Sequence, residues 1–131
     1  MNDFNNNSIS PKRINQAIRA LLTDLGFCTR LKGFDYMVRA IELVYLDPNK
    51  LNGIVKNVYT TIAQEFNVHP SCVERNCRTL LRVRWRMPSH REFKRLIFPR
   101  LHNGKVVPPV KEFIYSVCNL LTKMFNDGEI M

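Results

Sequence analysis

Apolar residues recur along this chain mostly at intervals of three and four, the spacing that gives a helix one buried face. The first such stripe follows Ser10-Pro11, a capping serine and a proline suited to the first helical turn, and stops at Gly26. Its apolar positions are Ile14, Ala17, Ile18, Leu21, Leu22 and Leu25. The residues before this predicted helix are polar and rich in asparagine. We therefore expect residues 1–9 to form a disordered arm ahead of one domain, residues 10–131.

Two further stripes predict the second helix and the last one. The second stripe covers residues 32–46 and stops at Asp47-Pro48, because the residue before a proline avoids helical angles. Its apolar positions are Phe34, Met37, Val38, Ile41, Val44 and Tyr45. The last stripe covers residues 110–125, after Pro108-Pro109. Its apolar positions are Phe113, Ile114, Val117, Leu120, Leu121 and Met124.

A helix-turn-helix is predicted over residues 61–81. The inner face of its first helix comprises Ile62, Ala63 and Phe66. Asn67 stands where the turn requires a positive φ, which asparagine tolerates better than most residues. His69 caps the second helix, and Pro70 occupies its first position in a helix of about residues 70–84. The inner face of this second helix comprises Val73, Cys77, Leu80 and Leu81.

The stretch between this motif and the last helix predicts one more short helix. Ser89 and Glu92, which follow Pro88, match a capping box, and the helix would end at Pro99. Asn103-Gly104 marks the tip either of a loop or of a small two-stranded hairpin, because Asn-Gly favours tight hairpin turns. The fold class predicted for the whole chain is therefore all-α, a six-helix bundle that contains a helix-turn-helix.

The second helix of the motif has an outer face of a single charge. Between Pro70 and Arg100 there are nine basic and two acidic residues, which is +7 of the net charge of +9. At 100° per residue, the side opposite Val73 collects Ser71, Arg75, Arg78, Arg82 and Arg86. Solvated helix faces usually mix both signs of charge, whereas arginine suits guanine and phosphate because its planar fork donates two hydrogen bonds. We predict a recognition helix for double-stranded DNA, with its N-terminal side chains at base edges and the later ones at phosphates.

Two charged residues of this helix leave alternatives open. Glu74 lies at the edge of the stripe and either accepts a hydrogen bond from cytosine or pairs with Arg78 four residues on. Arg84 projects onto the apolar side. Either the helix ends near Val83, or the stem of Arg84 follows apolar surface while its charged head reaches solvent. Trp85 is predicted to lie in the core.

Composition argues against several classes of function. No run approaches the roughly 18 apolar residues of a membrane span, and the N-terminus lacks the layout of a signal peptide, so we expect a cytoplasmic, nucleoid-associated protein. The four cysteines have no zinc-like spacing, although His69 and Cys72 share a helix face; we expect no metal site, with Cys77 and Cys118 as reduced core residues. Catalytic and nucleotide-binding motifs are missing, so we predict no enzyme activity, no catalytic residues, no cofactor and no small-molecule ligand.

Five stretches of the chain resemble the DNA-binding effector domain of the stage-zero sporulation transcription factor A family. They are LGFCTRLKGF from Leu25, RAIELVY from Arg39, GIVKNVY from Gly53, IAQEFN from Ile62 and SCVERNCR from Ser71. The last helix is also similar, through EFI from Glu112. The likeness leaves out only the N-terminal arm and the loop before the final helix.

The resemblance implies a six-helix domain that binds a short DNA box in the major groove, as a head-to-tail homodimer on tandem boxes. In that family a Glu-Arg pair and the arginine three residues later read bases, which implies base reading by Glu74, Arg75 and Arg78 here. The remaining polar residues of the outer stripe, Ser71, Arg82 and Arg86, are then expected to contact DNA phosphates.

Two departures from the family affect these expectations. The family usually has a basic residue before the Val-Glu-Arg stretch, where this chain has Cys72, so its target box is expected to differ or to be read less stringently. The family also carries an N-terminal receiver domain, for which the residues before Pro11 leave no room. We expect a stand-alone relative regulated in another way, rather than a piece cut from a longer protein.

The function predicted from the sequence is a sequence-specific, double-stranded DNA-binding transcription regulator. The alternative is a protein-interaction module that modulates a full-length sporulation-type regulator through dimer contacts. Such a module would have no need of the arginine stripe. RNA binding would require exposed aromatic residues for base stacking, whereas the aromatic residues here fall mostly at core spacing.

Overall fold

The computed structural model describes residues 10–87 and 107–128, which hold five α-helices and no strand. The helices are α1 (Pro11–Asp24), α2 (Lys32–Leu46), α3 (Thr60–Phe66), α4 (Pro70–Trp85) and α6 (Val110–Asn126). A short 3₁₀ helix, η2 (Pro48–Leu51), and a π-helix, η3 (Val55–Tyr59), connect α2 to α3. The all-α class is confirmed. The arm, the short helix predicted after Pro88 and the tip of the loop or hairpin lie outside the described residues, so a sixth helix stays a prediction.

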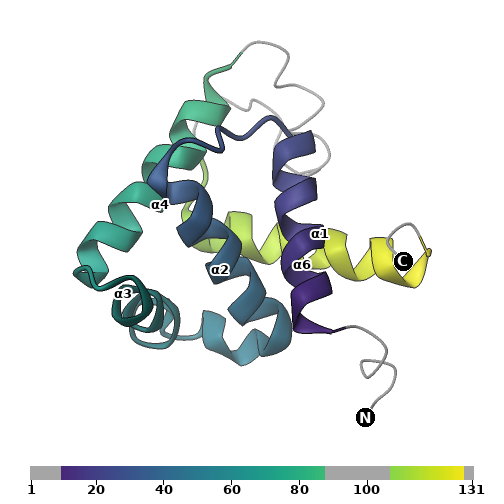
Figure 1. Cartoon of the computed structure of the whole chain (residues 1–131), viewed down its shortest axis with the longest axis horizontal. Coiled ribbons are helices and arrows are strands. Elements are labelled where there is room, and N and C mark those ends of the chain that lie inside the picture. The colour runs from purple at the N-terminus through teal and green to yellow at the C-terminus, as the bar shows by residue number, and fades with distance from the viewer. Residues whose placement is uncertain (1–9, 88–106, 129–131) are drawn as a thin grey trace.

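The middle of the bundle is α2. It lies between α1 and α4, and α6 crosses behind it (Figure 1). Five of the six positions predicted to be buried in α2 are buried, and the sixth, Tyr45, is only partly buried. Burial also extends beyond the predicted face to Gly33, Tyr36, Ala40 and Glu42. A single apolar stripe was too narrow a prediction, because neighbours pack against α2 from several sides.

Gly33 marks the closest approach between α2 and α4. A Cβ atom built at this position would lie 2.1 Å from the carbonyl oxygen of Asn76 and 3.1 Å from the Cβ of Leu80. The first of these atoms belongs to helix backbone and has no rotamer by which to move away. The requirement for glycine here is therefore one of space, and it sets how closely α4 packs against α2.

The C-terminal end of α4 is held by a buried arginine. Arg84 is 7% exposed, and its Nε donates a hydrogen bond to the carbonyl oxygen of Leu25, in the turn after α1. Both sequence alternatives for this residue were wrong: the helix continues to Trp85, and the guanidinium stays inside instead of reaching solvent. Burial lowers the pKa of Arg84, but arginine starts from so high a value that it remains charged. Trp85 lies in the core, as predicted.

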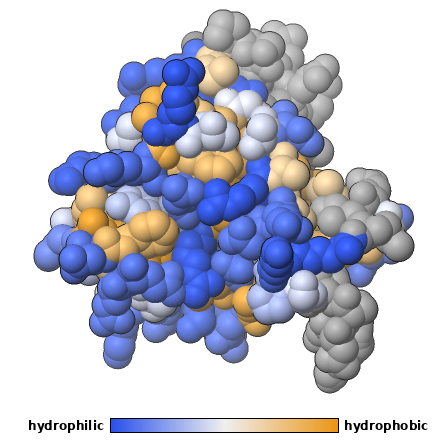
Figure 2. All heavy atoms as spheres, in the orientation of Figure 1, coloured by the Kyte–Doolittle hydropathy of each residue, from blue (hydrophilic) through white to orange (hydrophobic). Residues whose placement is uncertain are grey.

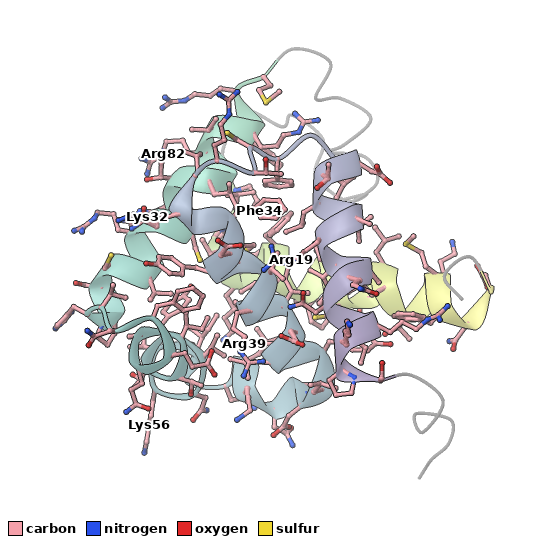
Figure 3. The ribbon with its side chains drawn as sticks, in the orientation of Figure 1. Arg19, Lys32, Phe34, Arg39, Lys56 and Arg82 are labelled. Atoms are coloured by element: carbon pink, nitrogen blue, oxygen red, sulfur yellow. The ribbon has the colours of Figure 1, made fainter. Side chains whose placement is uncertain are left out.

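An ion-pair network joins α2 to α3. Arg39 contacts Glu65 through two hydrogen bonds of 2.8 Å each and Glu42 through one of 2.9 Å. In Figure 3, Arg39 lies on the part of α2 that faces the turns of η3 and α3. The pairing lowers the pKa of the Glu65 carboxyl, so its contribution to stability is present at neutral pH and is lost as the pH falls through that lowered pKa. The network holds α3 in place beneath α4.

We predict that Gly33→Ala destabilises the fold by about 3 kcal/mol, the upper end of what overpacking costs, because the added methyl group meets backbone. The direction of the change in stability distinguishes a crowded site from an open one. In a helix with free space the same change would stabilise the protein by about 1 kcal/mol through helix propensity. Urea unfolding followed by circular dichroism measures the difference, and a stabilised variant would contradict the close contact between α2 and α4.

Candidate nucleic-acid interface

A three-residue turn connects α3 to α4. Asn67 has φ 57° and ψ 49°, the left-handed conformation predicted for it, and it is the only non-glycine residue with positive φ among those described. The backbone N–H groups of Asn67 and Val68 both donate to the carbonyl oxygen of Ala63. This geometry reverses the chain over a very short distance and brings the start of α4 next to the end of α3.

The N-terminus of α4 is capped by a histidine. The Nδ1 atom of His69 accepts a hydrogen bond from the backbone N–H of Ser71 at 3.1 Å, and Pro70 occupies the first helical position, as predicted. A backbone N–H can only donate, so Nδ1 is the acceptor in this hydrogen bond. The cap positions Ser71, whose hydroxyl lies 2.9 Å from the same nitrogen, at the exposed tip of the helix.

The inner faces of the two helices match the predictions with one exception. Ile62 and Ala63 of α3 are buried, as are Val73, Cys77, Leu80 and Leu81 of α4. Phe66, predicted to face inward, is 43% exposed. Its ring packs edge-on against Tyr36 of α2, with 5.1 Å between the ring centres, and the other side faces solvent. The end of α3 lies at the rim of the core, where one neighbouring helix cannot enclose a phenylalanine.

The turn of π-helix before α3 was not predicted. In η3 the backbone N–H and the hydroxyl of Thr60 both donate to the carbonyl oxygen of Val55, five residues earlier. Five-residue spacing shifts the helix face relative to regular α-helix, and no residue type in this stretch signals it. As a result, Val58 and Tyr59 face the core while Val55 is left 57% exposed.

The outer face of α4 is exposed along its whole length. Ser71, Arg75, Arg78, Arg82 and Arg86 all lie at the surface, on the side opposite the buried residues. Hydrophilic side chains project from the edge of the molecule that α4 forms (Figures 1 and 2), and Arg82 lies on that edge (Figure 3). The structure therefore brings the predicted stripe together on one accessible surface.

Glu74 and Arg78 form an ion pair within this surface. Arg78 Nη1 lies 2.6 Å from Glu74 Oε2, and both side chains are nearly half exposed. Of the two alternatives for Glu74, the structure shows the pairing with Arg78. An exposed pair of this kind is worth about 0.3–0.5 kcal/mol, so exchanging it for contacts with a nucleic acid costs little.

Two of the four cysteines, Cys77 and Cys118, pack in or against the core. Burial raises the pKa of both the Cys77 and the Cys118 thiols to about 12, so they are neutral at physiological pH. Cys77 is buried as predicted, and Cys118, half-buried, donates a hydrogen bond to the carbonyl oxygen of Ile41. Within residues 10–87 and 107–128, no group of three potential metal ligands is found, and His69 and Cys72 belong to no such group.

None of the helices in this described part of the chain has the length and apolar character of a membrane span.

A groove of about 420 Å³ runs beside the arginine stripe. One wall is Glu74, Arg78 and Arg82 of α4, and the other walls come from η3 with the residue before it and from the first turn of α6. The remaining lining residues are Ile54, Val55, Tyr59, Val107, Pro108, Pro109, Val110 and Lys111. The sequence analysis missed this groove, because its walls come from three separate parts of the chain.

Comparison with protein families agrees with this arrangement. Residues 18–121 match the family model described as the C-terminal domain of the sporulation initiation factor Spo0A. The chain belongs to this family. The match runs from the middle of α1 through α4 and most of α6, so it covers both the arginine stripe and the helices that position it. The Spo0A C-terminal domain is a DNA-binding domain of transcription regulators of sporulation and is not a family of enzymes.

Proposed function

We propose that this Spo0A-type domain binds specific sites in double-stranded DNA by placing α4 in the major groove, as the second helix of a helix-turn-helix. One observation carries the proposal: four exposed arginines share one face of a helix whose opposite face is fully buried. A B-DNA major groove is wide enough to admit one α-helix. A duplex would neutralise the charge that this face concentrates, and the proposed place of action is the nucleoid.

Base reading is assigned to Glu74, Arg75 and Arg78. They belong to the first turns of α4, next to the tip that the His69 cap holds in place. Arginine can donate two hydrogen bonds to guanine, and a glutamate can accept one from cytosine N4. The ion pair between Glu74 and Arg78 keeps the two side chains side by side, as contacts to neighbouring bases would require.

Phosphate contact is assigned to Ser71, Arg82 and Arg86. Ser71 lies at the exposed N-terminal tip of α4, where hydroxyl and backbone N–H groups suit a phosphate. Arg82 and Arg86 lie about 6 and 12 Å beyond Arg78 along the helix axis, at 1.5 Å per residue. A straight helix leaves the curved groove over such a distance, so its later side chains meet the sugar–phosphate backbone instead of base edges.

Arg75→Ala or Arg78→Ala should cost about 1–3 kcal/mol of binding free energy on the preferred site and relax specificity at one base position. The preferred site is obtained first by selection from random duplexes. Fluorescence anisotropy on that site and on a scrambled duplex then separates the two effects. Equal losses on both duplexes would contradict base reading and leave these residues as phosphate contacts.

For Arg82→Ala and Arg86→Ala we expect weaker binding to every duplex alike, with the slope of log K against log salt reduced by about 0.9. Each change removes one neutralised phosphate and leaves the base contacts intact. Titrations between 50 and 200 mM salt measure the slope. Wild-type slopes in both variants would place the two arginines outside the interface.

We also propose that two copies bind tandem boxes head to tail, as the family resemblance implies. On DNA the second binding event becomes effectively intramolecular, which raises its apparent affinity without a stable dimer in solution. Duplexes with one box, with two boxes, and with two boxes whose spacing differs by half a helical turn distinguish the possibilities. Cooperative filling at one spacing is expected, and independent filling at every spacing would show that the domain reads single boxes.

A further inference from the structure

The groove beside α4 has walls of two kinds. Its apolar lining includes Val55, which is 57% exposed, and the segment from Val107 to Val110. Its basic lining residues are Arg78 and Arg82 on the α4 wall and Lys111 on the α6 wall. The first turn of α6 lies next to α4 (Figure 1), so residues about 30 apart in sequence line the same groove.

The charge of this groove is positive and available to a ligand. Among the described residues that line it, the one acid is Glu74, which is paired with Arg78. Arg82 and Lys111 are both exposed, and neither makes an ion pair with any of the described residues. Arg82 and Lys111 come from different helices, and the other described lining residues are apolar apart from Tyr59 and the Glu74–Arg78 pair. Such a groove suits a ligand that carries anionic groups on a partly apolar scaffold.

We propose that this groove holds one sugar–phosphate strand of the duplex, with Lys111 as a second phosphate contact across from Arg82. Deoxyribose presents carbon and hydrogen to apolar side chains such as Val55, while the phosphates on either side of it are held at the two edges. The strand that Arg82 touches would then continue over η3 towards α6. This inference rests on the proposed function. It extends the DNA interface to the start of α6, which carries none of the arginines on the outer face of α4.

An acidic peptide of a partner protein has similar chemistry. Duplex DNA is favoured because the groove is continuous with the arginine stripe and shares Arg78 and Arg82 with it. A strand entering the groove would need no change in the position of α4, whereas a peptide in the groove would compete with DNA for the same two arginines. Replacing Lys111 distinguishes the two ligands experimentally. The salt dependence of DNA binding changes in such a variant only if Lys111 contacts a phosphate of the duplex.

The test uses the full chain and a labelled pool of random-sequence 20-base-pair duplexes, since a phosphate contact does not depend on sequence. Wild type, Lys111→Ala and Lys123→Ala are titrated by fluorescence anisotropy from 50 to 200 mM NaCl. Lys123 is the matched control: it is an exposed lysine of the same helix, about 18 Å further along α6. Circular dichroism verifies that each variant is folded.

We expect Lys111→Ala to lower the salt slope by about 0.9 and the affinity at 0.1 M salt by about eightfold, while Lys123→Ala matches wild type. A second variant, Val55→Glu, places a carboxylate on the apolar wall and should weaken binding, whereas the similarly shaped Val55→Thr should not. If wild type binds the pool but Lys111→Ala has its slope unchanged, or Lys123→Ala loses as much, the groove assignment is overturned while the proposed function stands. If wild type binds no duplex, the proposed function itself fails.

Discussion

The backbone contact between Gly33 of α2 and Asn76 of α4 is the constraint on which the rest of the molecule depends. With no side chain between the two helices, α4 lies directly on the central helix, and Val73, Cys77 and Leu80 are drawn into the core. Because one side of α4 packs this closely against α2, only the opposite side of α4 is left to face solvent. The orientation of the arginine stripe is therefore a consequence of packing on the inner face.

Both ends of α4 are fixed by polar contacts that differ in kind. At the N-terminus the ring of His69 accepts a hydrogen bond from the backbone N–H of Ser71, and at the C-terminus the buried guanidinium of Arg84 donates one to the carbonyl oxygen of Leu25. The adjacent Gly26 has φ +92°, and a Cβ there would lie 2.9 Å from Arg84 Nε, so the turn after α1 is shaped to receive this side chain. A helix held at both ends can present its outer side chains with little loss of conformational entropy on binding.

Arginines on the same helix thus have opposite roles, and the angle around the helix axis decides between them. Arg84 is enclosed and connects two parts of the fold, while Arg82 and Arg86 remain in water, where high dielectric keeps their mutual repulsion small. An approaching polyanion would remove that repulsion. The groove beside the stripe widens the surface on which this can happen, because η3 and the start of α6 meet α4 there.

Much of this could be predicted from local sequence. The range predicted for the second helix, residues 32–46, is the observed one, and the range predicted for the last helix differs from Val110–Asn126 by one residue. Periodicity and caps act within a few residues of one another, so the chain carries that information locally. The same holds for the left-handed Asn67, the His69 cap and the exposure of all five residues of the outer stripe.

The sequence by itself therefore determined the helices, the turn and the face that carries the charge. Only the tertiary structure decided the partner of Arg84, the half-exposed position of Phe66, the π-helical turn of η3, and the groove where residues 54–59 and 107–111 meet α4. Each of these depends on which distant surfaces pack together. The approach of Gly33 to Asn76, 43 positions away in sequence, decides this packing, and no local pattern encodes it.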